Sequence, residues 1–387
     1  MKAIIHAKAV LPGGILENAV ILTEGEKIQA VGTGLPVPAG AEVIDARGLW
    51  VGPGFVDIHN HGSGEENRVW AQDPERVSRY HLRHGTTTAC AYLGYDQDRE
   101  TLLRTTEKLQ AALDRGLAPN VYAIGFEGPY VNPSQGANVD RNDRGAPDPE
   151  EYTRLYEACH GKVMQWMYAP ERDEDGSFAA FLRERRIPTA IGHSNASPAQ
   201  VRTAVDRGAT ITTHLFDAMG CWLGPESIHL TGIIQDSMPV GCLICPELTY
   251  ELIPDSLGMH VKPANLKLVY QLAGPRRIAI ITDCTSRDYN PADYPEDPKR
   301  SVVDLNFNEK GELSGSALTM DQAFRNFMRH TGASVTDLFQ MTATTPARVT
   351  GIDHLTGSIV PGKNADLVML DSEFQVQGVF LRGSRVV

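Results

Sequence analysis

The strongest constraint on the fold is a short stretch near residue 55, where an apolar strand leads directly into two histidines. Phe55-Val56-Asp57-Ile58 follows a Gly-Pro-Gly turn and ends in His59 and His61. Because side chains alternate faces along a strand, residues two positions apart point the same way. Neutral imidazole is a good ligand for divalent transition metals. An arbitrary H-x-H pair is more often two solvent-facing loop residues, but the strand before this pair and Gly62 after it make a metal site an equal interpretation.

The middle of the chain alternates short apolar runs with helical patterns, which is typical of βαβ units. Helical patterns lie at 100–115, 197–207 and 264–272. Eight parallel strands with crossover helices form a (β/α)8 TIM-type barrel, so we predict an α/β protein of this class. The expected strands cover residues 54–61, 86–93, 121–127, 162–168, 188–193, 209–214, 239–245 and 277–283.

The two ends of the chain have a different texture. Residues 1–50 alternate Val/Ile segments with Gly and Pro turns, and residues 355–387 do the same. A barrel alone takes ~250 residues, and the chain has 387. We therefore expect a small β-sandwich domain formed from both ends, 1–50 plus 355–387, and a barrel over 51–354.

The expected strand ends carry the residues with chemistry. In a barrel of this kind the carboxyl ends of the strands converge on the active site. Singly, each residue has an ordinary explanation, such as a capping aspartate or a histidine at the edge of the core. Together, imidazoles and carboxylates at separate strand ends are what a divalent metal site with an adjacent general base requires. The set comprises His59 and His61 on strand one, Glu127 on strand three, His193 on strand five, His214 on strand six and Asp283 on strand eight.

Composition narrows the possible partners and the compartment. The formal net charge of -12 argues against a nucleic-acid or anionic-membrane partner and leaves a small-molecule substrate. The six cysteines are scattered, so we expect no disulfide framework and a reducing compartment. The C-x-x-C at 242–245 lies in an apolar run and is interpreted as core. The N-terminus lacks the apolar centre of a signal peptide, and no apolar run approaches membrane-spanning length. These features predict a cytoplasmic protein.

Several motifs resemble the N-acetylglucosamine-6-phosphate deacetylase branch of the amidohydrolase superfamily. The branch-specific ones are Gly-Phe-Glu-Gly-Pro at 125–129, Gly-His-Ser-Asn-Ala at 192–196 and Thr-His-Leu-Phe-Asp-Ala-Met at 213–219. Gly-Ser-Ile-Val-Pro-Gly-Lys-Asn-Ala-Asp at 357–366 is generic to the superfamily. The resemblance extends in order over essentially the whole chain.

The resemblance implies a role for each strand-end residue. Glu127, His193 and His214 would bind one divalent ion, while His59 and His61, with Glu127 shared, would bind a second. Zinc is the first expectation, with iron, manganese or cobalt as alternatives, and a homodimer is implied. Asp283 would act as general base and then as general acid. The residues expected to contact substrate are Asn138, Asp217, Ala218, Trp222, His229, His260 and Arg287.

The chain departs from the family where a substrate phosphate would bind. Pro225 occupies the place of an arginine that reaches the phosphate in a neighbouring subunit, Asp217 replaces an asparagine, and Asn138 stands where many members have histidine. Proline has neither charge nor donor. Either the substrate is not phosphorylated, which we favour, or another cation such as Arg287 or Lys262 binds the phosphate. Trp222 would stack on a sugar ring or anchor a dimer interface.

The expected reaction is metal-dependent hydrolysis of the N-acetyl group of an amino sugar. One alternative is another amidohydrolase reaction, on an N-acyl amino acid or a cyclic amide. Relatives of that kind often use a carboxylated lysine as the bridging ligand, where this chain has Glu127. A second alternative is a non-catalytic scaffold of the same fold, which should have lost ligands that this chain keeps.

Overall fold

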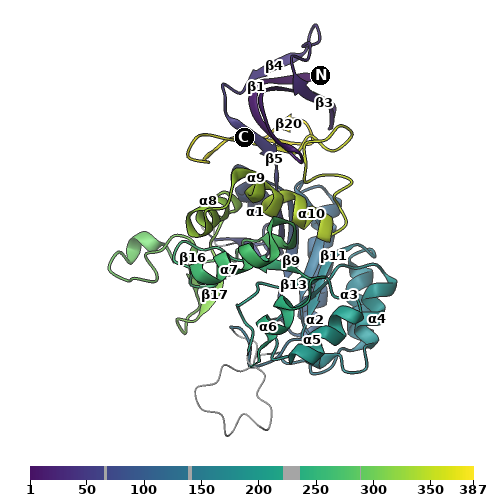
Figure 1. Ribbon diagram of the computed structural model, residues 1–387. Coiled ribbons are helices and arrows are strands. Elements are labelled where there is room, and N and C mark those ends of the chain that lie inside the picture. The colour runs from purple at the N-terminus through teal and green to yellow at the C-terminus, as the bar shows by residue number, and fades with distance from the viewer. Residues whose placement is uncertain (65–67, 138–141, 221–235, 288) are drawn as a thin grey trace.

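The computed structural model describes residues 1–64, 68–137, 142–220, 236–287 and 289–387. A small sheet, which carries both chain ends, lies at one end of the molecule, and the barrel with its helices makes up the rest (Figure 1). The predicted fold class is confirmed.

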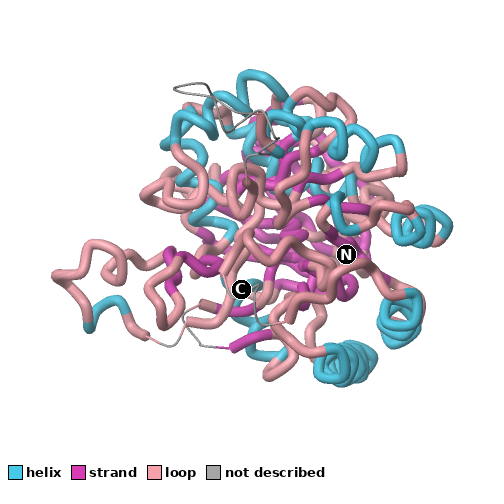
Figure 2. Tube along the Cα trace, turned by 90° about the horizontal axis from the view of Figure 1, so that it is seen from below, coloured by secondary structure: helices cyan, strands magenta, loops and turns pink. Residues whose placement is uncertain are grey.

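The barrel is an eight-stranded parallel sheet in which each strand pairs with the next one along the chain, so the connections are simple crossovers. Figure 2 shows these strands gathered at the centre with helices outside them. The strands are almost fully buried, as expected of a parallel sheet covered on both faces. They are β6 (Phe55–Asn60), β9 (Thr86–Leu93), β10 (Val121–Glu127), β11 (Val163–Tyr168), β12 (Thr189–Ile191), β13 (Ile211–Thr212), β14 (Thr249–Leu252) and β15 (Ile278–Ile280).

The outer helices begin at strong sequence signals. The side chains of Asp73, Asp98 and Ser197 each accept a hydrogen bond from a backbone N–H of the first turn of their helix. Proline occupies an early position of several helices, where its missing N–H costs nothing. The helices are α1 (Pro74–Arg83), α2 (Arg99–Asp114), α3 (Pro149–Ala158), α4 (Ser177–Glu184), α5 (Pro198–Asp206), α6 (Met238–Leu243), α7 (Pro263–Ala273), α8 (Met320–Thr331), α9 (Val335–Phe339) and α10 (Thr345–Val349).

The seventh barrel strand is not where the sequence pattern placed it, and that prediction was wrong. The apolar run 239–245 forms most of helix α6, with Val240 and Ile244 exposed on one side, four residues apart. A short apolar run does not distinguish a buried strand from a helix, and a proline beside its start favours the helix. The true seventh strand, β14, includes Thr249 and Tyr250, both strand-favouring residues, and the buried Glu251.

The small sheet combines both chain ends in one continuous hydrogen-bonded sheet. Strands β5 and β18 pair antiparallel, and this pairing joins the strands from the N-terminal end of the chain to those from the C-terminal end. Side chains such as Ile4, Ile21 and Phe380 form an apolar core of its own. The strands are β1 (Lys2–Leu11), β2 (Gly14–Glu24), β3 (Lys27–Thr33), β4 (Glu42–Asp45), β5 (Trp50–Pro53), β18 (Leu367–Leu370), β19 (Val376–Leu381) and β20 (Ser384–Arg385).

Two short hairpins lie outside the two main sheets. One pairs β7 (Gly62–Ser63) with β8 (Arg68–Val69), directly after the first barrel strand. The other pairs β16 (Leu305–Phe307) with β17 (Leu313–Ser316), at the base of an arm that projects from the barrel in Figures 1 and 2.

The barrel closes between its first and last strands through a short seam. The backbone N–H of Asp283 donates to the carbonyl of His59 at 3.0 Å, and the N–H of His61 donates to the carbonyl of Cys284 at 2.8 Å. Beneath this seam, the hydroxyl of Thr282 donates to the buried carboxylate of Asp57 at 2.6 Å. Burial raises the pKa of Asp57 to about 6, although hydrogen bonds from Thr282 act in the opposite direction.

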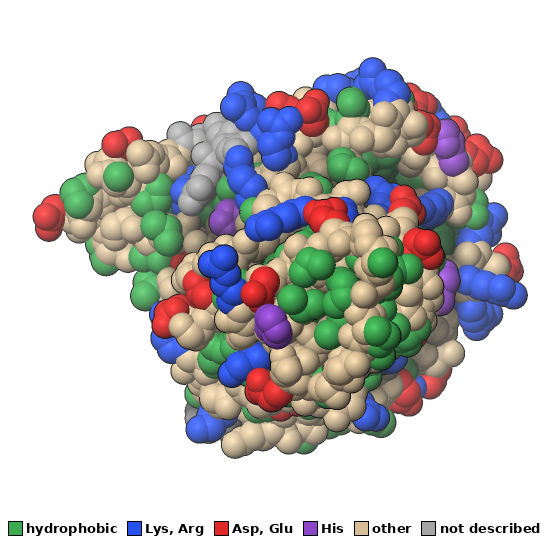
Figure 3. All heavy atoms as spheres, turned by 90° about the horizontal axis from the view of Figure 1, so that it is seen from above, with side chains coloured by type: hydrophobic (Ala, Val, Ile, Leu, Met, Phe, Trp, Pro, Cys, Tyr) green, Lys and Arg blue, Asp and Glu red, His purple; other side chains and the backbone are tan. Residues whose placement is uncertain are grey.

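On the face that carries the small sheet, neither positive nor negative side chains predominate. Figure 3 shows Lys and Arg side chains interspersed with Asp and Glu, with apolar side chains between them. The net charge of -12 is therefore not concentrated on this face. Among the described helices, none combines the length and the apolar character needed to cross a membrane.

The seam gives a test of what holds the barrel closed. Thr282→Val keeps the side-chain shape and removes a donor from the Asp57 carboxylate, which is fully buried. Losing a hydrogen bond to a buried charged group costs about 1.5–3 kcal/mol. We expect the free energy of unfolding in urea to fall by that amount, whereas Thr203→Val, at an exposed helix position, should change it by less than about 0.5 kcal/mol. Equal stability of the two variants would contradict this account.

Candidate metal centre

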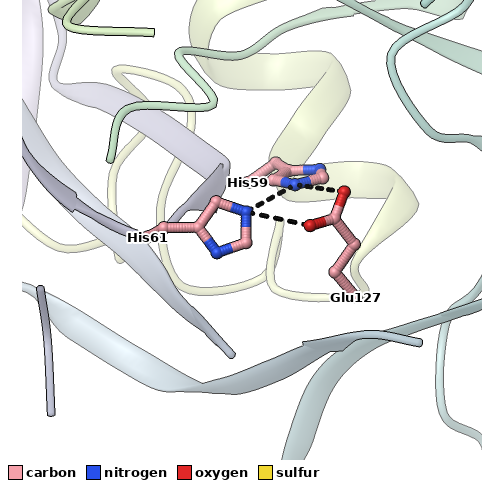
Figure 4. A group of neighbouring side chains, drawn as sticks. All are labelled: His59, His61 and Glu127. Carbon is pink, nitrogen blue, oxygen red and sulfur yellow. Dashed lines mark hydrogen bonds and ion pairs between the residues drawn. The ribbon is translucent and has the colours of Figure 1, made fainter. Parts of the chain in front are cut away.

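Five predicted ligands meet at the carboxyl ends of the barrel strands, around one carboxylate. The Oε1 atom of Glu127 lies 2.8 Å from Nε2 of His193, 3.1 Å from Nε2 of His214 and 3.4 Å from Nε2 of His59. The other oxygen, Oε2, lies 3.2 Å from Nε2 of His61. Figure 4 shows His59 and His61 directed at the Glu127 carboxylate. Two groups of three ligands that share Glu127 are thereby formed among the described residues.

The second ring nitrogen of each histidine faces an oxygen acceptor. Nδ1 of His61 lies 3.1 Å from the carbonyl of Tyr92, that of His193 lies 3.0 Å from the carbonyl of Gln135, and that of His214 lies 3.1 Å from the carbonyl of Asp217. Since a carbonyl oxygen only accepts, each Nδ1 must carry the proton. Nε2 is therefore the nitrogen of each ring that is directed at the other ligands and that would bind a cation, as in protein metal sites generally.

The spacing of these atoms fits a divalent ion. Ligands about 2.1 Å from a tetrahedral zinc ion lie roughly 3.4 Å from one another. The His59 and His61 Nε2 atoms are 3.2 Å apart, and those of His193 and His214 are 3.1 Å apart. Lone pairs facing each other at such distances repel unless a cation or a proton lies between them. The donor set and its spacing therefore suit a divalent metal.

The carboxylates of the site favour protonation of the imidazoles when no cation is bound. Burial would lower the pKa of His61, but hydrogen bonds to Asp283 and Glu127 outweigh it and raise that pKa to about 9. Burial also opposes protonation of His214, and its hydrogen bond to Glu127 raises that pKa to about 9. Burial would raise the pKa of Glu127, yet the surrounding imidazoles, His193 and His59 first among them, hold it well below its usual range.

Asp283 lies beside the first group of ligands. Its Oδ1 atom is 3.4 Å from Nε2 of His59 and 3.2 Å from Nε2 of His61. Burial would raise the pKa of this carboxyl, but the hydrogen bond from His61 and the charges of the two imidazoles lower it. Asp283 is therefore ionised at neutral pH and can accept a proton next to the ligands.

Three of these residues have a backbone conformation that is uncommon for side chains with a Cβ. The φ angles of His193, His214 and Asp283 are 44°, 24° and 49°. Each lies two or three residues beyond the end of its strand, so the left-handed turn aims the side chain across the barrel mouth. Such conformations cost roughly 1–3 kcal/mol each and persist where the surroundings impose them.

Sequence reasoning missed Glu251. Its Oε2 atom lies 3.1 Å from Nδ1 of His59, and its Oε1 atom accepts a hydrogen bond of 2.7 Å from Gln165. His59 is thus the one histidine of the four whose Nδ1 faces a charged acceptor. Both side chains are fully buried. Glu251 was missed because the seventh strand was predicted at 239–245, before this residue. The signal that would have found it is a single glutamate within the apolar and strand-favouring residues at 249–252.

The remaining predicted contacts have different positions. Asp217 and Ala218 line a pocket over the metal centre, together with Asp283 and the ligands His61 and Glu127. Three predicted contacts, Asn138, Trp222 and His229, lie outside the described residues. Pro225 lies outside them as well.

His260 and Arg287 are both nearly buried, and neither is among the residues that line this pocket. Nδ1 of His260 lies 3.1 Å from the carboxylate of Asp255, and its Nε2 lies 3.2 Å from the carbonyl of Gly315, a pocket residue. Arg287 instead donates to the carbonyl of Val303 at 2.8 Å and is not among the residues that line the pocket.

Comparison with known proteins places the chain among metal-dependent hydrolases. The model of the Amidohydrolase family matches residues 50–386. The N-acetylglucosamine-6-phosphate deacetylase of Rattus norvegicus is 27% identical over 370 residues, which cover 89% of this chain and 85% of that protein. The N-acetylgalactosamine-6-phosphate deacetylase of Escherichia coli O157:H7 is 28% identical over 371 residues, 90% of each.

Solved structures agree over the full length. The N-acetyl-D-glucosamine-6-phosphate deacetylase of Mycobacterium smegmatis superposes with a TM-score of 0.80 at 28% identity and covers 100% of both chains. A mutant of that enzyme in complex with N-acetyl-D-glucosamine-6-phosphate gives a TM-score of 0.82 at 28% identity, covering 100% of this chain and 99% of the other.

The Glu251 contact predicts unequal ion binding. Glu251→Gln keeps a hydrogen-bond acceptor for His59 and removes the charge. Loss of such an outer partner typically lowers metal affinity 10–100-fold. We expect chelator competition to show this loss for the ion at His59 and His61, with the ion at His193 and His214 retained, and Glu247→Gln, at an exposed site, to match wild type. Unchanged binding of both ions in Glu251→Gln would refute this role.

The raised imidazole pKa values predict that metal uptake releases protons. With pKa values of about 9, His61 and His214 are protonated in the apo protein at neutral pH, and they must lose those protons to bind metal. Affinity should therefore fall as pH falls below about 9. Calorimetric titration near pH 7.5 in buffers of different ionisation enthalpy should show a net release that vanishes above about pH 10. A binding heat independent of the buffer would be inconsistent with this protonation state.

Proposed function

The chain belongs to the amidohydrolase family, and from this premise we propose that it is a metal-dependent deacetylase that hydrolyses the N-acetyl group of an amino sugar. The observation that carries the proposal is the set of four Nε2 atoms around Glu127, with the ionised Asp283 against two of them. The names of the deacetylase relatives support the substrate class. The site carries this proposal, because the barrel alone hosts many chemistries.

A bound divalent ion supplies two things in such a site, a water of lowered pKa and polarisation of the substrate carbonyl. Glu127, His193 and His214 would hold one ion, and His59 and His61 with Glu127 would hold a second. We propose zinc for both positions, because the ligands are imidazole and carboxylate at distances that suit tetrahedral coordination.

Asp283 performs the proton transfers. Its Oδ1 atom lies 3.4 Å from Nε2 of His59 and 3.2 Å from Nε2 of His61. The carboxylate can therefore take the proton of the attacking water. It then holds that proton at the carboxyl and returns it to the departing amine. An amine leaves poorly unless protonated, so one residue serves the two steps in turn.

His260 is suited to stabilise the charge that develops on the acetyl oxygen. Both of its ring nitrogens face acceptors, Asp255 and the Gly315 carbonyl. Burial would lower the pKa of His260, but the Asp255 carboxylate and other nearby charges raise it above its ordinary value. We assign it to the acetyl end of the substrate, where its Nε2–H would exchange the Gly315 carbonyl for the acetyl oxygen, because a hydrogen-bond donor counts most in the transition state.

We also propose a cytoplasmic homodimer. The five described cysteines are all buried and unbonded, which suits a reducing compartment. The dimer follows from the family resemblance, and sedimentation of the metal-loaded protein at several concentrations would test it.

Acetate release tests the proposed reaction. The metal-loaded protein should release acetate from at least one member of a panel of N-acetyl-hexosamines and their 6-phosphates, and the chelator-stripped protein should not. Hydrolysis of N-acyl amino acids or cyclic amides, with none of the sugars turned over, would favour the alternative amidohydrolase reaction.

Asp283→Asn isolates the proton transfer step. The amide keeps the shape of the side chain and cannot accept the proton, so kcat should fall by ~10²–10⁴-fold while metal content stays at the wild-type level. Asp293→Asn, in the arm and away from the pocket, serves as the matched control. Near-normal kcat in Asp283→Asn would exclude it as the base.

A further inference from the structure

Glu171 connects three loops at the mouth of the barrel. It lies in the short 3-10 turn that follows strand β11. Its Oε2 atom accepts a hydrogen bond of 2.5 Å from the hydroxyl of Ser194. Its Oε1 atom accepts one of 2.8 Å from the N–H of Asn195 and one of 2.9 Å from the side-chain amide of Asn132. All three donors are neutral groups, and hydrogen bonds to an ionised acceptor are stronger than those between neutral groups. One carboxylate thus joins the loops that follow the third, fourth and fifth strands.

Two of these donors belong to residues that fix the backbone of His193. The N–H of Asn132 donates to the carbonyl of His193 at 2.8 Å, and Ser194 is the next residue along the chain. The φ angle of His193 is 44°, a conformation that is uncommon for a residue with a side chain. Glu171 therefore helps to impose the turn that directs Nε2 of His193 at the Glu127 carboxylate, 2.8 Å away.

The side chain of Asn195 extends the network to the acceptor of the His193 ring. Its Nδ2 atom donates to the hydroxyl of Ser134 at 2.7 Å, and its Oδ1 atom accepts from the side-chain amide of Gln135 at 2.9 Å. The carbonyl of Gln135 is the oxygen that lies 3.0 Å from Nδ1 of His193. A Cβ at Gly220 would lie 1.6 Å from Oδ1 of Asn195, so the loop after the sixth strand packs directly against this amide. Both the backbone and the ring of His193 are thereby linked to Glu171.

Glu171 and Glu251 act on different ligands of the metal centre. Glu251 faces Nδ1 of His59, whereas the hydrogen bonds of Glu171 lead to His193. Groups behind a ligand orient it and thereby set the affinity for the metal. Resting on the proposed two-ion centre, we propose that Glu171 is a positioning residue for His193. It sets the affinity of the ion at His193 and His214 independently of the ion at His59 and His61.

The test isolates each ion with a ligand variant of the full-length protein. His59→Ala leaves the ligands of one ion, Glu127, His193 and His214, intact. In this background, Glu171→Gln should lower the zinc affinity measured by chelator competition about 10–100-fold, because the amide nitrogen cannot accept the hydrogen bonds that the carboxylate oxygen accepts. Glu174→Gln, at an exposed position in the same connection, should leave the affinity unchanged. Unchanged affinity in Glu171→Gln would overturn the proposal.

The opposite background measures selectivity. His193→Ala leaves His59, His61 and Glu127 for the other ion, and there Glu171→Gln should change the zinc affinity by less than about threefold, because independent sites contribute additively. An equal loss in both backgrounds would mean that Glu171 supports the barrel in general, which contradicts the proposed role. If the wild-type protein bound no zinc, the proposed function and this inference would both fail. Zinc binding without turnover of any amino sugar would refute the deacetylase function alone.

Ser194→Ala provides a second variant that removes only one donor to Glu171. In the His59→Ala background it should lower the zinc affinity less than Glu171→Gln does. Combining Ser194→Ala with Glu171→Gln should cost less than the sum of the two separate losses, because both variants break the same hydrogen bond. Strictly additive losses would show that the two residues do not act on His193 through one network, contrary to the proposal.

Discussion

The architecture of the site depends on how the Glu127 carboxylate is compensated. It is almost fully buried, and four imidazole nitrogens surround it at 2.8–3.4 Å. A buried carboxylate is costly unless it is paired. A divalent cation held by the imidazoles and the carboxylate together would provide that pairing.

The barrel supplies the rigidity that this arrangement needs. His59, Glu127, His193 and His214 lie at the ends of four different strands, so no local segment could bring them together. Three oxygen acceptors of the backbone and the carboxylate of Glu251 then fix the ring orientations. The strained φ angles of His193, His214 and Asp283 persist because these contacts and the neighbouring strands impose them.

Most of the barrel and all of the proposed ligands could be predicted from sequence, because strand ends in this fold converge and the polar residues there stand out against apolar strands. Where the pattern was ambiguous, prediction failed. The run 239–245 is equally apolar as helix or strand, and apart from Pro239 at its start the pattern does not mark the helix that exposes Val240 and Ile244. Glu251 was missed for the same reason, and its partner His59 is distant in sequence. The position of Arg287 depends on a contact with Val303 across a loop, which no periodicity encodes.

The seam of the barrel has a consequence for thermal inactivation. The backbone hydrogen bond from Asp283 to His59 joins the proposed proton acceptor to a proposed ligand, and the same bond closes the first strand against the last. Opening this seam, which the bonds from His61 and Gly62 to the Cys284 carbonyl also hold, would separate these two groups while the helices remained intact. Activity would then be lost before the far-ultraviolet signal of the helices changes, so catalysis itself reports whether the barrel is shut.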